Sequence, residues 1–267
     1  MELVKRTGHD SPYLATLEGK ILLRQSGEVA AAAAFRRGVA LSEGESQPYD
    51  AWPHFFLGRT LLKVNQTEEA IDVLYRGEMI LTSRRRPRRD LLIAIRTQLA
   101  IGYVYNDDLA NAKRIFDLIA ADDSGKPEVV WAFALYRAAA GDDGKTGDLA
   151  KETLRELNPN SAKDRYDRCQ IFLFRAMIYL GTGNKERASE EFSKAHQADP
   201  RNVFVLLRWA NTLIELARQS DTDDEHQAAR ICAEHAKSLA DKVLEFDKGN
   251  EDALALLERI SDDFSIV

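Results

Sequence analysis

A spaced pair of small residues recurs along the sequence and constrains the fold more than any other feature. In the clearest copy, Ala176 is followed twelve residues later by Ala188, with Gly183 between them and Pro200 at the end. A small residue on each of two consecutive helices lets their backbones approach closely. Glycine between them breaks the helix, and proline cannot continue it. The pattern therefore predicts a helical hairpin over about residues 169–202.

The same skeleton recurs in six units. The small residue of the first helix is Gly19, Gly58, Ala100, Ala138, Ala176 and Ala210. The first five units continue with Ala31, Ala70, Ala112, Ala150 and Ala188, and then with a large apolar residue at Phe35, Leu74, Phe116, Leu154 and Phe192. The sixth unit fits if an insertion lies near residues 218–230. A last amphipathic stretch, with Leu254, Leu257 and Ile260 on one face, is expected to cap the array.

These residues resemble the tetratricopeptide (TPR) repeat family, over about residues 12–250. The resemblance implies an all-α fold, an α-solenoid of stacked antiparallel helix pairs that forms a right-handed superhelix. It implies a single domain over residues 1–267, with units at about 12–45, 51–84, 93–126, 128–162, 169–202 and 203–250 and a cap at 251–267. It also implies that the first helix of each repeat lines a concave surface, where a protein or peptide partner would bind.

Helical spacing identifies the residues that would line this surface. Offsets of 0, 3, 7 and 11 share one helix face. They predict partner-binding residues at Tyr13, Lys20, Arg24, Trp52, Phe55, Arg59, Lys63 and Tyr105, and an apolar lining further on that includes Leu173, Phe204 and Leu207. The expected ligand is an acidic and apolar segment. Two alternatives stay open: the cations are solvated surface compensated by Glu28, Glu68 or Glu69, and Trp52 and Phe55 pack in the core between repeats.

An arginine run predicts an anion-binding loop between the second and third units. It consists of Arg84, Arg85, Arg86, Arg88 and Arg89 around Pro87. Guanidinium groups bind phosphate and carboxylate strongly. Nucleic acid is a possible ligand, but the net charge of −6 and the lack of interleaved aromatic residues disfavour it. The alternative is a solvated connector.

No catalytic residue, metal site or cofactor is predicted. The stretch from Gly141 to Gly147 resembles the end of a phosphate-binding loop, but Ala139 stands where the motif needs glycine and no strand precedes it. Cys232 and His235 lie one helical turn apart, yet the spacing of neighbouring ligands is irregular for zinc.

The sequence also predicts where the protein acts. Two cysteines do not form a disulfide framework, the first residues lack an apolar stretch of signal-peptide type, and the longest apolar run, residues 29–35, is too short to span a bilayer. We expect a cytoplasmic, non-catalytic adaptor or scaffold for protein–protein interaction. Two alternatives are a regulatory or assembly subunit of a larger secretion, pilus or defence complex, and a nucleic-acid-associated repeat protein that uses the arginine run.

Overall fold

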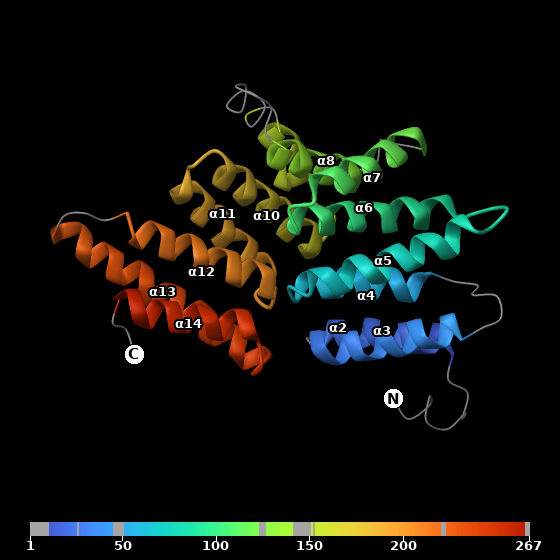
Figure 1. Cartoon of the computed structure of the whole chain (residues 1–267), viewed down its shortest axis with the longest axis horizontal. Helices are drawn as coiled ribbons and strands as arrows, with labels where there is room; N and C mark the ends of the chain where they lie inside the picture. Colours follow the sequence, from blue (N-terminus) through green and yellow to red (C-terminus); the bar gives the residue numbers. More distant parts are fainter. Residues whose placement is uncertain are drawn as a thin grey trace. The chain divides into compact units, whose positions relative to one another are not determined.

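The protein is built from α-helices that pack in pairs (Figure 1). A computed structural model describes residues 11–25, 27–44, 51–122, 127–140, 151, 153–219 and 223–264. Its helices are α2 (Pro12–Arg24), α3 (Glu28–Glu43), α4 (Trp52–Lys63), α5 (Thr67–Thr82), α6 (Arg89–Tyr105), α7 (Leu109–Asp122), α8 (Pro127–Ala140), the 3-10 helix η1 (Pro159–Ser161), α10 (Arg165–Gly181), α11 (Lys185–Ala198), α12 (Val203–Ala217), α13 (Asp223–Phe246) and α14 (Glu251–Phe264). No strand occurs within these residues, which confirms the predicted solenoid of antiparallel helix pairs.

The chain divides into two compact units, Met1–Tyr136 and Arg137–Val267. In the first unit, α2 packs on α3, α4 on α5 and α6 on α7, while α2 also contacts α4 and α4 contacts α6. The first helices of these three hairpins therefore lie side by side in a row. In the second unit, α10 packs on α11, α12 on α13, and α14 on both α12 and α13. The prediction of one domain over residues 1–267, with its six unit boundaries, stays a prediction.

Close contact between a glycine and a large side chain sets the spacing of the helices in the first two hairpins. A Cβ atom on Gly19 would lie 2.4 Å from Cε1 of Phe35, and one on Gly58 would lie 2.3 Å from Cγ of Leu74. Both distances are far shorter than van der Waals contact, so only glycine fits at these crossings. In these two hairpins the small residue of the first helix therefore meets the large apolar residue of the second, whereas the sequence placed the close approach at the two small residues.

The turns within the hairpins share one backbone conformation. Asn65, Asp107 and Gly183 have positive φ angles of 64°, 58° and 76°, and each occupies the middle of a three-residue turn. In every case the next residue donates its N–H to the carbonyl five positions back, as in a Schellman motif. The same position thus closes successive hairpins, although the sequence marks it with glycine only once.

The last helices bear on two expectations, and the second of these is wrong in detail. The insertion predicted near residues 218–230 coincides with the start of a long helix, since α13 runs for 24 residues from Asp223. On α14 the buried face consists of Ala253, Leu256 and Ile260, whereas Leu254 is 48% exposed. The buried residues are spaced by three and then four positions, which matches the helical period of about 3.6 residues. The predicted residues Leu254, Leu257 and Ile260 are spaced by three and three, which matches it less closely.

No helix in the described part of the chain is long and apolar enough to cross a membrane. The segment from Gly141 to Gly147 lies outside the described residues.

We expect Gly58→Ala to destabilise the protein, although alanine is the better helix former by about 1 kcal/mol. The new methyl group would overlap the side chain of Leu74, and such overpacking typically costs about 1–3 kcal/mol. Urea unfolding followed by circular dichroism measures the change. Gly249→Ala is the matched control, because no atom lies within 4 Å of its added Cβ. Equal unfolding midpoints for the two variants would contradict the assigned helix crossing.

Candidate functional site

The first turns of α2 and α4 place two aromatic side chains beside each other. Ser11 caps α2 by accepting a hydrogen bond from the backbone N–H of Leu14 at 3.2 Å, and proline stands in the first turn of both helices. Proline at this position has its φ angle preset for the helix and lacks the N–H that would otherwise be unpaired. The sequence therefore fixes where each helix begins, and with it the positions of Tyr13 and Trp52.

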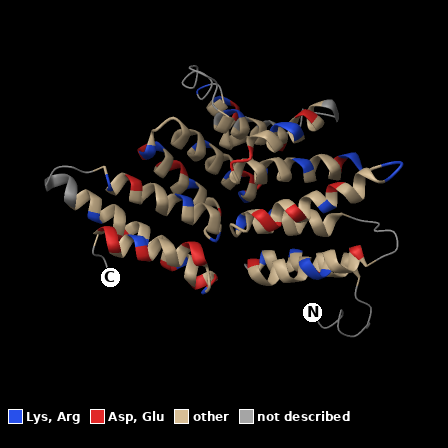
Figure 2. Cartoon of the chain, viewed as in Figure 1, with Lys and Arg blue, Asp and Glu red and all other residues tan. Residues whose placement is uncertain are grey.

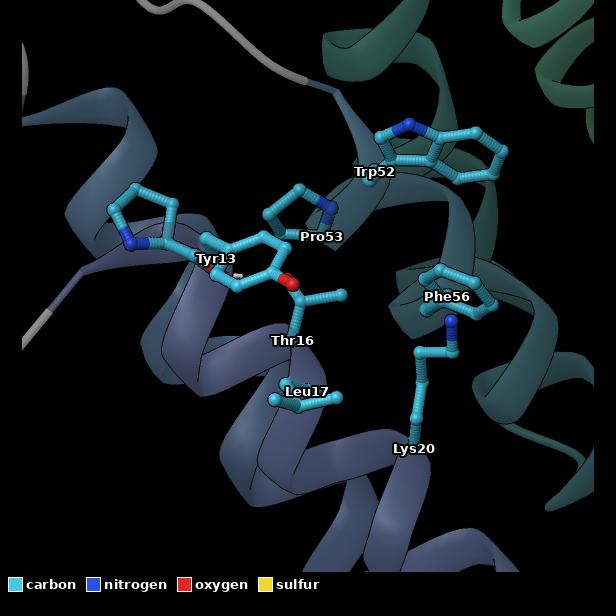
Figure 3. Close-up of a pocket in the computed structure, with 8 residues that line it drawn as sticks. Tyr13, Thr16, Leu17, Lys20, Trp52, Pro53 and Phe56 are labelled. Carbon is cyan, nitrogen blue, oxygen red and sulfur yellow. Dashed lines mark hydrogen bonds between the residues drawn. The ribbon is translucent and has the colours of Figure 1, made fainter. Parts of the chain in front are cut away.

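A pocket of about 210 Å³ lies between these two helices (Figure 3). Its lining consists of Pro12, Tyr13, Thr16, Leu17 and Lys20 from α2 and Trp52, Pro53 and Phe56 from α4. Tyr13 and Trp52 stand on opposite sides of it. The hydroxyl of Thr16 donates to the carbonyl of Pro12 at 2.7 Å, so it is occupied by its own helix. The remaining surface of the pocket is mostly apolar, with the ammonium group of Lys20 at its edge.

Stacked rings build one wall of the pocket. The Trp52 and Phe56 rings stack with centroids 5.6 Å apart and planes at 24°. Phe55 packs edge-on against both, at 5.6 Å from Trp52 and 5.2 Å from Phe56. Phe56 also stacks on the fully buried Phe35 at 5.6 Å. This aromatic cluster, Trp52, Phe55 and Phe56, is therefore anchored to the core of the first hairpin while part of its surface faces solvent.

Three cations lie over the three rings of the aromatic cluster. Lys20 Nζ is 5.1 Å from the centroid of Phe56, and the guanidinium of Arg59 is 5.9 Å from that of Phe55. The guanidinium of Arg88 is 5.6 Å from the centroid of Trp52. Cation–π contacts of this length are attractive, by about 0.5–1 kcal/mol at exposed positions. The rings thus gather positive charge around the pocket.

Most of the predicted partner-binding residues meet here, and other side chains, Leu17 and Phe56 among them, complete the pocket. Tyr13, Lys20 and Trp52 line the pocket, and Phe55 and Arg59 belong to the adjoining cluster. Leu17 and Phe56 were not among the predicted residues. They stand four positions after Tyr13 and Trp52, an offset that also falls on the same helix face.

Three other predicted residues lie at the opposite ends of the helices. Arg24 ends α2, Lys63 ends α4 and Tyr105 ends α6, whose 17 residues span about 25 Å. Lys63 forms an ion pair with Glu28 at 2.7 Å, and its side chain is only 13% exposed. Compensation by Glu28, one of the sequence-based alternatives, is therefore present for this cation. A role for these three residues in partner binding stays a prediction.

The apolar lining predicted for the later repeats is wrong. Leu173, Phe204 and Leu207 are buried in the second unit, with 1%, 1% and 4% of their surface exposed. Phe204 and Leu207 belong to α12, which packs against α11, α13 and α14. These side chains belong to the core and are not available to a partner.

The arginine run connects α5 to α6. Arg85, Arg86, Arg88 and Arg89 are exposed and Arg84 is half-buried. Figure 2 shows the run as a positively charged loop that projects between the two helices. Arg88 is the N-cap residue of α6 with extended backbone angles, and α6 starts at Arg89. The anion-binding role predicted for the loop stays a prediction.

Two histidines enclose a tryptophan in the second unit. The rings of His196 and His235 lie 5.9 and 4.7 Å from that of Trp209, whose indole N–H donates to Ser189 Oγ at 2.8 Å. Burial also raises the pKa of the neighbouring Cys232 thiol, which keeps it protonated. Among the described residues no group of three or more histidine, cysteine or acidic side chains could hold a metal ion.

Comparisons with known proteins identify a shared fold. No protein-family model matches the sequence, and no curated protein matches it. The structure of NprR in complex with its cognate peptide NprX is 15% identical, with a TM-score of 0.59 over 99% of this chain and 77% of that chain. YrrB, a TPR protein with an unusual peptide-binding site, is 15% identical over 77% and 94% of the two chains, with a TM-score of 0.41. The TPR2AB domain of yeast Sti1, in complex with pHSP90, is 14% identical over 94% and 98%, with a TM-score of 0.39. The likeness to NprR confirms the predicted helix-pair fold.

We expect the protein to lose stability as the pH falls below about 6.5. Burial, followed by the charge of Lys242, lowers the pKa of both His196 and His235 from the ordinary value of 6.5. The unfolded chain therefore binds more protons than the folded one between the lowered pKa and 6.5, and stability rises with pH through that window. Replacing both histidines by glutamine should flatten the dependence of the urea midpoint on pH between about pH 7.5 and 5.5. Carboxylates titrate alike in the original protein and in the double variant. If the urea midpoint depends on pH with the same slope in both proteins, the histidines contribute nothing.

Proposed function

We propose that the protein is a non-catalytic adaptor that holds a peptide segment of a partner in the pocket between α2 and α4. The observation that carries the proposal is the partly exposed aromatic cluster beside an exposed cation, at the pocket of the first unit. Tryptophan, tyrosine and arginine are the residue types that most often anchor interfaces. NprR, which shares the fold, is seen in complex with its cognate peptide, and this supports the same kind of ligand here.

The size of the pocket favours a side chain of a polypeptide over a small-molecule ligand. Its volume of about 210 Å³ lies below the range of about 300–1,000 Å³ that is usual for ligand pockets. One large apolar side chain would fit against Tyr13, Leu17 and Phe56. Because Phe56 is held by its stacking on Phe35, the wall it forms is already in place before the ligand arrives.

The charge at the pocket favours an acidic ligand. Lys20 is exposed, sits over the Phe56 ring and makes no ion pair among the described residues. A carboxylate of the partner would complement this ammonium, which sets orientation and raises the association rate more than it raises affinity. We therefore propose a segment with a large apolar residue and an acidic residue, acting in the cytoplasm as the sequence predicts.

Tyr13→Ala tests the pocket with little risk to the fold, because Tyr13 is 72% exposed. Peptides selected by phage display against the whole chain should combine a large apolar residue with acidic residues. Tyr13→Ala should weaken their binding at least about tenfold, as truncation of an aromatic anchor does. Tyr75→Ala, also an exposed tyrosine at 43% but outside the pocket on α5, is the matched control. Equal affinities for the two variants would rule out the pocket as the binding site.

Trp52→Ala separates anchoring from core packing, the alternative left open by the sequence. Trp52 is half-buried and stacked on Phe56, so some loss of stability is expected. An anchor also loses affinity, by about 2 kcal/mol or more, when binding is measured on the folded protein. A variant that is less stable but binds the selected peptides as tightly as the original would assign Trp52 to the core alone.

A further inference from the structure

One residue joins the arginine run to the pocket. Arg88 belongs to the run by sequence, and its guanidinium lies over the ring of Trp52, which lines the pocket. The ring of Trp52 is also stacked on that of Phe56. Two regions that are separate in the sequence are therefore continuous on the surface of the first unit.

Positive charge is concentrated along this continuous surface. Lys20, Arg59 and Arg88 surround rings whose centroids are 5.2–5.6 Å apart, and Arg85, Arg86 and Arg89 continue from Arg88. Several acidic side chains of α2 and α3 are engaged elsewhere: Glu18 with Arg37, Glu28 with Lys63 and Glu43 with Arg76. Within the run and the first turn of α6, Asp90 is the one acidic residue. Anionic groups of a partner would relieve the repulsion between these cations.

We propose that the pocket and the arginine run form one recognition surface for a polypeptide segment in which a large apolar side chain stands next to a cluster of anionic groups. The apolar side chain enters the pocket, and the anions extend past Trp52 to Arg85, Arg86 and Arg89, with Arg88 shared by both parts. This inference rests on the proposed function and adds the chemistry of the segment beside the anchor.

The stacking of the rings favours a polypeptide over a single-stranded nucleic acid. Proteins that bind single strands leave aromatic faces open, so that bases can stack on them. Here Trp52 has Arg88 over its ring and Phe56 stacked on it, and Phe56 is also stacked on Phe35. A base that stacked on Trp52 or Phe56 would compete with a ring or a cation, whereas an aliphatic side chain needs only the pocket.

Guanidinium groups distinguish between the two sources of anionic charge. A phosphoserine carries a charge of about −1.5 to −2 and three acceptor oxygens, whereas a glutamate carries a single charge. Arginine can bind either one with two parallel hydrogen bonds. A peptide with phosphoserines should therefore bind this surface more tightly than a peptide with glutamates at the same positions.

Synthetic fluorescent peptides on a glycine–serine background test the inference by anisotropy. The probes carry one leucine beside a run of glutamates, the same leucine beside glutamines, the glutamates without leucine, and the leucine beside phosphoserines. The glutamate peptide should bind about tenfold more tightly than the glutamine peptide. That advantage should shrink at high salt, because salt screens exposed charges.

Variants show which part of the surface, the arginine run or the pocket, binds which part of the peptide. The double variant Arg85→Ser/Arg86→Ser should reduce the advantage of the glutamate peptide over the glutamine peptide, and should leave the affinity for the glutamine peptide unchanged. Lys113→Ser/Arg114→Ser on α7 removes the same charge from exposed residues outside the run, and should preserve the advantage. Tyr13→Ala should weaken the binding of all three leucine peptides.

The outcomes separate this inference from the proposed function. If the glutamate and glutamine peptides bind equally, or if the loop and α7 variants act alike, while Tyr13→Ala still weakens binding, the pocket stands and the joint surface is overturned. If Tyr13→Ala leaves every affinity unchanged, the proposed function and the inference both fall. Tighter binding of an oligouridine probe than of the glutamate peptide, lost in the loop variant, would assign the arginine run to nucleic acid and overturn the inference.

Discussion

The contact between Gly19 and Phe35 is the constraint on which the proposed site depends. Because no Cβ fits at Gly19, α2 and α3 approach until the Phe35 ring fills the space between them. Phe35 is fully buried, and its ring stacks on Phe56 from the next hairpin at 5.6 Å. The same ring therefore closes the first hairpin, orients the second against it and supports the wall of the pocket. A substitution that moved Phe35 would therefore also move Phe56 and alter the wall of the pocket.

The regular and irregular connections of the chain have different roles. Within hairpins, Asn65, Asp107 and Gly183 close the turns with one backbone conformation, so each pair of helices has the same local geometry. A non-glycine residue with positive φ is uncommon, and asparagine and aspartate tolerate it best. In the described connections between hairpins no such turn occurs, and the connection from α5 to α6 carries the arginine run.

The extent to which the sequence predicts this protein depends on whether an interaction is local. The helix pairs were predictable because Gly58 and Leu74 follow a fixed spacing within one hairpin. The burial of Phe204 and Leu207 was not, since it depends on how α12 packs against the separate helices α11, α13 and α14. For the same reason the sequence gives no sign that Arg88 lies over Trp52. Phe56 was within reach of the pattern, because an offset of four from Trp52 is as consistent with one helix face as an offset of three.

The cations over the rings also determine how a ligand could be selected. Each cation–π contact holds a long side chain that would otherwise lose rotamer freedom on binding, and this lowers the entropic cost of recognition. The contact with Trp52 places Arg88 between the apolar and the anionic parts of the surface, so a group bound by one part changes the surroundings of the other. A ligand with only an apolar anchor leaves the cations crowded, and a ligand with only anions leaves the pocket hydrated. If the proposed surface binds as we infer, selectivity for a segment that carries both follows from Arg88, the residue that the two parts share.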